Sequence, residues 1–307
     1  MAQRIDVHHH VVPPAYRERL LRSGTDAGGR DVPDWSPQAS LDLMGRNDIG
    51  TAILSVTTPG VEPWLGGDAR AMARSVNEYC AELAAEHPGR FGFWATLTLP
   101  DVDGALAEAA YALDELHADG VVLLANSAGT YLGDPSFEPL MDELGRRGAV
   151  VFVHPSALPA EPVPGIPPFA ADFLLDTTRA AANLAANGTL HRHPDLKIIL
   201  SHAGGFLPYA AERIAACLEM AGDERGTADL LTDLRRFYFD TALSASPYSL
   251  PGLTAFADPE RILFGSDFPY APAEIATIMT GRLDTAPELD HPAINRTNAT
   301  RLLPHLA

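Results

Sequence analysis

Residues 5–10 read Ile-Asp-Val-His-His-His, an apolar strand-like segment that runs directly into three histidines. In an extended strand the side chains of residues i and i+2 point to the same face, so His8 and His10 project together. His9 points to the opposite face, and we expect it to be a partly buried polar residue outside the site. Neutral imidazole is a common metal ligand, so His8 and His10 at the end of a buried strand form half of a metal site.

Seven more short apolar runs follow, and several are rich in β-branched residues and almost continuously apolar, as expected for strands that are covered on both faces. The predicted strands are 4–8, 51–56, 91–97, 120–124, 150–154, 197–201, 237–240 and 262–265. Helical patterns between them cover 38–46, 69–87, 104–118, 137–147, 170–186, 206–221 and 253–257. This alternation predicts an α/β fold, a (β/α)₈ TIM barrel that spans residues 1–307 as a single domain. A doubly wound open sheet is the alternative, but it usually has a Gly-rich turn where this chain has histidines.

Three long segments that follow strands are rich in Pro, Gly or small polar residues: 11–36, 155–169 and 240–251. In a barrel, the loops after strands lie on the C-terminal face, where the chemistry takes place. The proline-rich part, 159–168, predicts an irregular lid or a contact between two subunits.

The acidic net charge of the chain argues against binding to nucleic acids or membranes. With 22 basic and 40 acidic residues the formal net charge is −18, and phosphate attraction needs a basic surface, so we expect neither a nucleic-acid nor a membrane partner. No run of apolar residues is long enough to span a bilayer, and the first residues lack the apolar centre of a signal peptide. Cys80 and Cys217 lie in helix-like segments and are expected to be buried free thiols, which is typical of a cytoplasmic protein.

Ionisable residues end four of the predicted strands. His8 and His10 end the first, His154 the fifth, His202 the sixth and Asp267 the eighth. A single histidine at a strand end is more often a satisfied polar residue than a ligand, but a barrel brings all its strand ends to one rim. The joint pattern therefore predicts a metal site, which zinc suits best, with manganese, iron and cobalt as alternatives.

The chain also resembles the amidohydrolase superfamily over its whole length, in particular the branch around aminocarboxymuconate-semialdehyde decarboxylase and the hydroxybenzoate decarboxylases. The motifs that carry the resemblance are residues 5–10 followed by Pro13-Pro14, Ser201-His202-Ala203-Gly204-Gly205, Gly265-Ser266-Asp267-Phe268-Pro269 and the closing segment 294–304. The first half, with Trp35-Ser36-Pro37 and residues 55–60, is most similar to the 6-methylsalicylate decarboxylase group.

This resemblance implies one divalent metal ion, zinc or manganese, held by His8, His10, His154 and Asp267. It places His202 beside the metal as an acid/base and implies a homodimer. Binuclear members often bridge two metals with a carboxylated lysine at the end of strand four, but the only lysine here, Lys197, opens strand six. A single-metal site follows.

The activity implied is non-oxidative decarboxylation of a small aromatic acid such as a salicylate derivative. Asp267 would gain a proton when substrate binds and deliver it to the ring carbon that carries the carboxylate. A metal-dependent hydrolase of a lactone, amide or ester is the alternative, because it needs the same metal, histidine and carboxylate. A catalytically inactive barrel that binds a ligand is a third interpretation, and loss of a metal ligand would be its signature.

Further residues are candidates for substrate contact, each with a structural alternative. Arg179 could bind a carboxylate or form an ion pair on a helix surface. Asp240 could bind substrate or orient a ligand histidine. Aromatic residues in loops after strands could form apolar walls or simply pack the loops: Trp35, Trp64, Phe169, Phe173, Phe268 and Tyr270.

Overall fold

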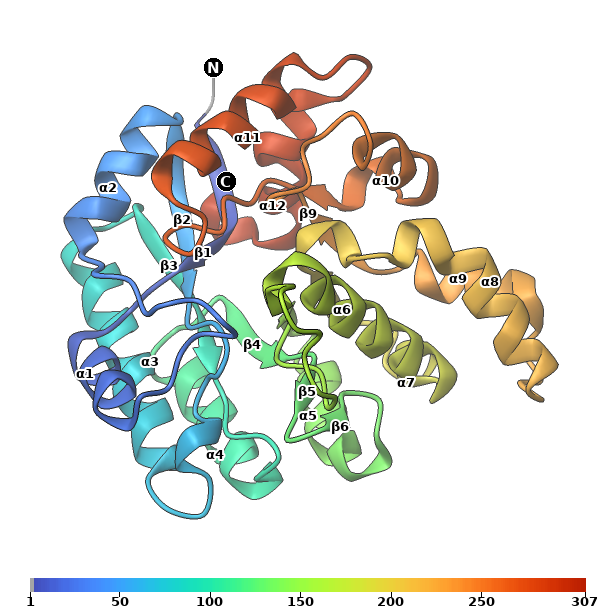
Figure 1. The fold of residues 1–307 in the computed structure, drawn as a ribbon, viewed down its shortest axis with the longest axis horizontal. Helices are drawn as coiled ribbons and strands as arrows, with labels where there is room; N and C mark the ends of the chain where they lie inside the picture. Colours follow the sequence, from blue (N-terminus) through green and yellow to red (C-terminus); the bar gives the residue numbers. More distant parts are fainter. Residues whose placement is uncertain (1–2) are drawn as a thin grey trace.

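The computed structural model describes residues 3–307, and its main sheet has eight parallel strands in the order β1-β2-β3-β4-β7-β8-β9-β10 (Figure 1). They are β1 (Arg4–His10), β2 (Ile49–Ser55), β3 (Phe91–Thr96), β4 (Gly120–Leu124), β7 (Val150–His154), β8 (Lys197–Leu200), β9 (Tyr238–Asp240) and β10 (Ile262–Leu263). All eight predicted strands are therefore present. The hairpin formed by β5 (Asn126–Ser127) and β6 (Thr130–Tyr131) was not predicted, because two residues are too few to show a pattern.

The first and last strands meet through the residues after β10. Val7 N–H donates to the Phe264 carbonyl (3.0 Å), and His10 N–H donates to the Phe268 carbonyl (2.7 Å). The Asp267 N–H donates to the His8 carbonyl (2.8 Å). These bonds bring the two ends of the sheet together, so the expected (β/α)₈ barrel is confirmed.

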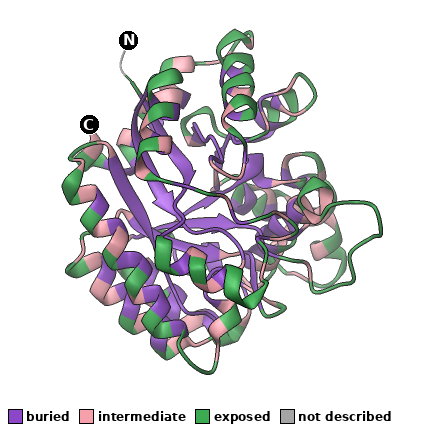
Figure 2. Ribbon diagram, turned by 60° about the vertical axis from the view of Figure 1, so that its left-hand side comes forward, coloured by how far each residue is buried: buried purple, intermediate pink, exposed green. Residues whose placement is uncertain are grey.

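Helices cover the outside of the barrel, and their exposed faces surround a buried ring of strands (Figure 2). They are α1 (Pro14–Ser23), α2 (Pro37–Arg46), α3 (Ala69–Glu86), α4 (Val102–Asp114), α5 (Glu138–Arg146), α6 (Pro168–Ala186), α7 (Thr189–Arg192), α8 (Leu207–Met220), α9 (Gly226–Leu234), α10 (Leu250–Phe256), α11 (Ala273–Thr285) and α12 (Asn298–Leu302). Each predicted helix has a counterpart among them.

The expectation of a loop over 11–36 was wrong in part, because α1 lies inside it. Pro14 occupies the first turn, where its missing N–H costs nothing, and Tyr16 and Leu20 form a buried stripe one turn apart. The short apolar pattern is hidden by the charged residues around it. Helices α7, α9, α11 and α12 were also missed.

Two buried clusters make up the core. One lies inside the barrel and includes Ile5, Val7, Trp94 and Phe152, and the C-terminal helix contributes Leu302 to it. The other fills the space between strands and helices. Trp94 Nε1–H donates to the Val7 carbonyl (2.9 Å), which satisfies the indole inside an apolar interior.

Two further sequence expectations can be compared with the fold. Cys80 is buried, but Cys217 is exposed on α8, so the expectation that both thiols are buried was wrong for Cys217. Within residues 3–307, none of the helices has both the length and the apolarity that crossing a bilayer requires.

Candidate metal centre and active-site cavity

Four ligand atoms lie together at the C-terminal end of the barrel strands. His8, His10, His154 and Asp267 each present one nitrogen or oxygen, and these atoms all lie within 4.8 Å of one another. The Nε2 atoms of His8 and His10 are 3.0 Å apart and lie 3.1 and 3.0 Å from Asp267 Oδ1. All four side chains are buried. Three imidazoles and a carboxylate at this spacing fit one divalent cation, and their role as its ligands stays a prediction.

The strands explain how these side chains meet. His8 and His10 occupy alternate positions of β1, so one strand directs both rings to the same side. His154 is the last residue of β7, and Asp267 follows β10 with a φ of 61°. A left-handed backbone at a non-glycine residue costs free energy and persists where the surrounding structure enforces it, as it commonly does at functional sites.

Asp240, at the end of β9, orients His8 and the backbone of His202 through hydrogen bonds. Its Oδ2 accepts a hydrogen bond from His8 Nδ1 (2.7 Å), which leaves His8 Nε2 facing the other ligand atoms. Its Oδ1 accepts the backbone N–H groups of His202 and Ala242, each at 2.9 Å. Asp240 is fully buried and does not line the cavity. The predicted role in substrate binding is therefore not supported, and the alternative role of orienting a histidine fits the geometry.

Backbone carbonyls orient the other two imidazoles. His10 Nδ1 donates to the Ser55 carbonyl (3.2 Å), and His154 Nδ1 donates to the Pro155 carbonyl (2.9 Å). Both contacts place the proton on Nδ1 and leave Nε2 free to bind a cation. The fit of the site to a metal thus includes the groups that fix the ligand tautomers.

Charges within the cluster are strongly coupled. Burial lowers the pKa of His8, but the carboxylates of Asp240 and Asp267 outweigh burial and raise this pKa to about 10. Burial raises the pKa of Asp267, yet His8 and His10 hold it well below its usual range. Burial lowers the pKa of His10 and of His154, and the neighbouring imidazoles add to the effect at His154. At neutral pH the metal-free cluster therefore holds a cationic His8, an ionised Asp267 and two neutral histidines.

This charge state predicts that metal binding releases a proton. A metal ligand must be deprotonated, and the raised pKa means that His8 keeps its proton up to about pH 10 in the metal-free protein. At pH 7.5 binding of Zn²⁺ should release about one proton per ion, and metal affinity should rise with pH until the release disappears above pH 10. Calorimetric titrations in two buffers with different ionisation enthalpies measure the number of protons released per metal ion. Binding without proton release would show that His8 does not carry a proton in the metal-free protein.

His202 lies beside the cluster without joining it. Its ring centroid is 4.9 Å from that of His8 and 5.9 Å from that of His154. Burial lowers the pKa of His202, so the imidazole is neutral near pH 7. Nδ1 lies 3.3 Å from the Ala242 carbonyl, to which an Nδ1–H donates, and Nε2 is then free to accept a proton. Its φ of 52° is another left-handed backbone position within the site.

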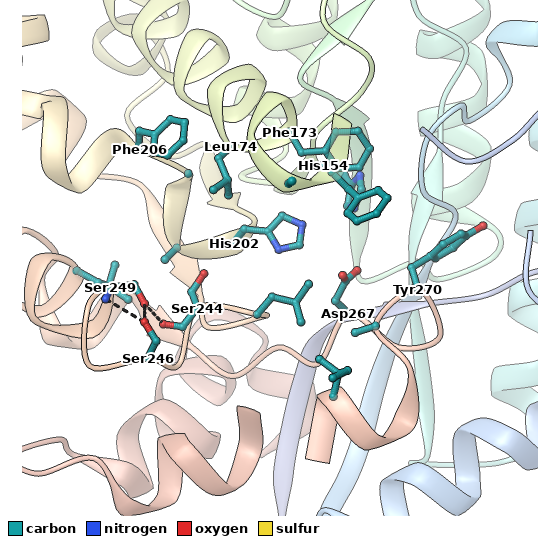
Figure 3. Close-up of a pocket in the computed structure, with 18 of the residues that line it drawn as sticks. His154, Phe173, Leu174, His202, Phe206, Ser244, Ser246, Ser249, Asp267 and Tyr270 are labelled. Atoms are coloured by element: carbon teal, nitrogen blue, oxygen red, sulfur yellow. Dashed lines mark hydrogen bonds between the residues drawn. The ribbon is translucent and has the colours of Figure 1, made fainter. Parts of the chain in front are cut away.

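A cavity of about 760 Å³ opens onto these groups. Figure 3 shows His154, His202 and Asp267 at one end of it, together with the rings of Phe173 and Tyr270. Phe169, another predicted wall residue, also lines the cavity. Most of the remaining lining is apolar, so the site offers an apolar slot beside the ligand cluster.

Several predicted contact residues lie elsewhere. Arg179 is exposed on α6 and does not line the cavity, so its expected contact with substrate is not supported. Phe268 points away from the cavity, with its ring centroid 5.3 Å from that of His9. Trp35 Nε1–H donates to Ser40 Oγ (2.8 Å) and packs a loop, while Trp64 stacks edge-on against a tyrosine. The contacts of Phe268, Trp35 and Trp64 fit the alternative of structural packing, and the ion pair suggested for Arg179 stays a prediction.

A sequence model of the amidohydrolase family matches residues 5–305. The chain belongs to this amidohydrolase family. Among its relatives, the 6-methylsalicylic acid decarboxylase of Penicillium expansum is 40% identical over an alignment of 318 positions, gaps included, that covers 99% of this amidohydrolase and 97% of that relative.

Solved structures agree with this assignment. A 2,6-dihydroxybenzoate decarboxylase in complex with 2,6-dihydroxybenzoate superposes with a TM-score of 0.76 and 26% identity, over 99% of this amidohydrolase and all of that chain. A dihydroxybenzoic acid decarboxylase from Polaromonas sp. JS666 with bound manganese shares the fold, with a TM-score of 0.79 and 22% identity over 99% and 97% of the two chains. The expected family and the expected class of enzyme, a decarboxylase, are confirmed.

Other residues of the amidohydrolase site were missed. His9 is fully buried rather than partly buried, and it holds the barrel to α2 through Ser40 Oγ (2.8 Å). Thr57 places its Oγ1 3.2 Å from His154 Nδ1, and its position directly after β2 was the available signal. Arg30 and Leu243 line the cavity from long loops, where no periodic pattern marks a side chain that points inward.

Proposed function

We propose that this amidohydrolase is a metal-dependent decarboxylase of a small hydroxyaromatic acid such as a salicylate derivative. The observation that carries the proposal is the group of His8, His10, His154 and Asp267 at one end of an apolar, aromatic-lined cavity. The 6-methylsalicylic acid decarboxylase from Penicillium expansum supports the choice of substrate class.

The four clustered side chains would hold one divalent cation. When bound there, the ion would act as a Lewis acid that neutralises negative charge on the oxygens of the substrate. The resident ion is proposed to be zinc, which suits three imidazoles and a carboxylate, and manganese is the alternative that the Polaromonas enzyme suggests.

Asp267 and His202 would move the protons. Asp267 is ionised in the resting protein because its pKa is low, so it can take the proton of the substrate's phenolic hydroxyl on binding. It would then deliver that proton to the ring carbon that carries the carboxylate. The bond to the carboxylate breaks, its electron pair returns to the ring, and carbon dioxide leaves.

The remaining proton comes from solvent. The product leaves as a phenol, so its phenolate oxygen must be protonated again, and His202 Nε2 is placed to relay that proton. The aromatic rings of Phe173 and Tyr270 keep bulk water away while the ring is dearomatised, which strengthens the electrostatic contacts within the site.

Reaction in D₂O tests the proposed chemistry. Incubating 6-methylsalicylate labelled with ¹³C in the carboxylate should yield labelled carbon dioxide and a phenol with one deuterium at the vacated ring carbon, visible by mass spectrometry. The alternative of a hydrolase gains no support from the named relatives. Acid release from lactones or esters, with no labelled carbon dioxide from any hydroxybenzoate, would refute the decarboxylase.

We further propose that residues 1–307 act as one domain in a homodimer. The proline-rich segment after β7 exposes Val163, Ile166 and Phe169, an apolar group that a second subunit could cover. Sedimentation of a single chain at micromolar concentration would contradict the dimer.

A cytoplasmic location is proposed as well. The exposed free thiol of Cys217 suits a reducing compartment. The state of that thiol in intact cells, measured with a thiol-alkylating reagent, tests the location, and full oxidation would contradict it.

A further inference from the structure

The cavity is larger than a single-ring acid needs. Cavities of about 300–1,000 Å³ commonly hold drug-sized ligands, and this one has a volume of about 760 Å³. Figure 3 shows that it continues from the Asp267 end, past His202, to a second group of side chains that includes Phe206 and Ser249. We call this second group the distal end and define it as Phe206, Leu243, Ser244, Ser246, Ser249 and Leu253.

The serines at the distal end are already engaged with one another. Ser246 Oγ lies 2.8 Å from Ser249 Oγ, and the Ser249 hydroxyl donates to the Ser244 carbonyl. Ser246 Oγ also accepts the backbone N–H of Ser249 (3.2 Å). These bonds tie the turn that begins α10, so the hydroxyls of Ser246 and Ser249 are committed to the protein. The distal end therefore presents chiefly apolar surface to a ligand.

Leu243 is the unusual residue of this region. Its φ of 53° places a leucine in the left-handed region, which costs free energy for a side chain of this kind. It is also 39% exposed, although it is apolar. Neighbouring contacts fix its backbone, because Ala242 N–H donates to Asp240 and the Ala242 carbonyl faces His202 Nδ1. An apolar side chain is thus held at a strained position beside the acid/base histidine, facing the cavity.

Charge limits what can occupy the distal end. Among the described residues that line the cavity, Arg30 is the only arginine or lysine. Its Nη2 donates to the Tyr270 carbonyl (2.8 Å), and its guanidinium lies 5.1 Å from the centroid of the Phe169 ring. Tyr270 belongs to the metal end, so the distal end has no cation that could pair with a second carboxylate.

We propose that the distal end binds an aliphatic substituent on the aromatic acid, and that Leu243 selects for it. This inference rests on the proposed decarboxylase function. The carboxylate and phenolic oxygen occupy the end near Asp267, and a ring substituent of about three to five carbons reaches the apolar surface around Leu243 and Leu253. A second acidic group is excluded, because no arginine or lysine among the described residues lines the distal end to pair with it.

Substrate series test the inference. The metal-loaded enzyme is assayed with salicylates that carry methyl, propyl or pentyl at position 6, and with a matching series at position 4. Each methylene that moves from water into an apolar site strengthens binding about fourfold, so propyl, with two more methylenes, should exceed methyl in kcat/KM by about 16-fold in one of the series. Equal or falling kcat/KM with chain length in both series would overturn the inference.

Two variants test whether the distal end causes the preference for longer alkyl substituents. Leu243→Asn removes the apolar contact but suits a left-handed backbone, so the protein should stay folded while the propyl-to-methyl ratio falls at least threefold. Gly252→Leu adds bulk to the cavity lining, because a Cβ at Gly252 meets nothing within 4 Å, and it should lower kcat/KM for pentyl at least tenfold.

Gly281→Leu is the matched control. Gly281 also lies within a helix with nothing within 4 Å of an added Cβ, but it does not line the cavity. It should leave the chain-length preference unchanged. If Leu243→Asn and Gly252→Leu also leave the preference unchanged, the distal end does not select the substituent.

Binding of product analogues separates this inference from the reaction itself. Calorimetry with 3-methylphenol, 3-propylphenol and 3-pentylphenol measures the apolar contact without turnover. Tighter binding of the longer phenols, lost in Leu243→Asn, would support the distal end even if no salicylate were decarboxylated, which would be a failure of the proposed function alone. No gain in binding with chain length would contradict the inference in either case.

Discussion

Asp267→Asn is expected to lower kcat by about 10³-fold or more while the protein remains folded. The amide cannot carry the proton that the ring carbon must receive, and acid/base groups typically contribute about 10²–10⁴-fold to the rate. The substitution keeps the shape of the side chain, and asparagine tolerates the left-handed backbone at this position. Steady-state kinetics with 6-methylsalicylate, together with circular dichroism and metal analysis of the purified variant, give the measurement.

Asp48 provides a matched control for this substitution. It has a φ of 53°, close to that of Asp267, but it is exposed between α2 and β2. Asp48→Asn makes the same chemical change on the same kind of backbone and should leave kcat unchanged. If Asp267→Asn binds metal and retains more than a tenth of the original kcat, Asp267 is not the proton donor.

Removal of the metal is expected to abolish turnover. Without the metal ion, the cationic His8 faces the carboxylates of both Asp240 and Asp267, so a third carboxylate, that of the substrate, would be repelled and would bind weakly. Dialysis against a chelator should lower activity by about 10³-fold, since a metal ion supplies several kcal/mol of stabilisation to a developing oxyanion. Added Zn²⁺ or Mn²⁺ should restore it, and the better of the two identifies the preferred ion. Full activity in metal-free protein would end the proposal of metal dependence.

The chain offers an internal comparison for the metal site. Glu138, Asp142 and His193 also place possible ligand atoms within 4.8 Å of one another, but Arg192 already pairs with Glu138. His193→Gln should therefore leave one equivalent of metal per chain. His154→Gln, at the buried cluster, should lose it. Equal metal contents in the two variants would show that the buried cluster does not hold the ion.

The architecture was predictable because it depends on local pattern. Short apolar runs alternating with helical segments are visible in the sequence, and each run at 120–124 and 150–154 became a strand with the same bounds. Helix α1 was missed because its apolar face is only two residues wide, with Tyr16 and Leu20 among charged neighbours. The closure of the barrel could not be predicted from any local sequence pattern, because it depends on hydrogen bonds between β1 and residues 264–268.

The candidate centre was predictable for a similar reason. A strand end is a position in a repeating pattern, so histidines and an aspartate at several strand ends indicate one rim. The cavity walls follow no such rule. Phe268 was a candidate for the wall and Arg179 for contact with a substrate carboxylate, but neither lines the cavity. Leu243 lines it without any sequence signal.

The sequence by itself determined the strand order and five ionisable side chains at strand ends, since alternation along a strand and chemistry at its end are properties of neighbouring residues. The resemblance to the amidohydrolases separated the four clustered side chains from His202. Only the tertiary structure decided the protonation state of the buried ligand cluster and which loop residues line the cavity. The pKa of His8 depends on Asp240 and Asp267, which are more than 230 positions away in the chain. The direction in which a loop residue such as Leu243 points depends on contacts made by Asp240 and His202, and no local pattern records those contacts.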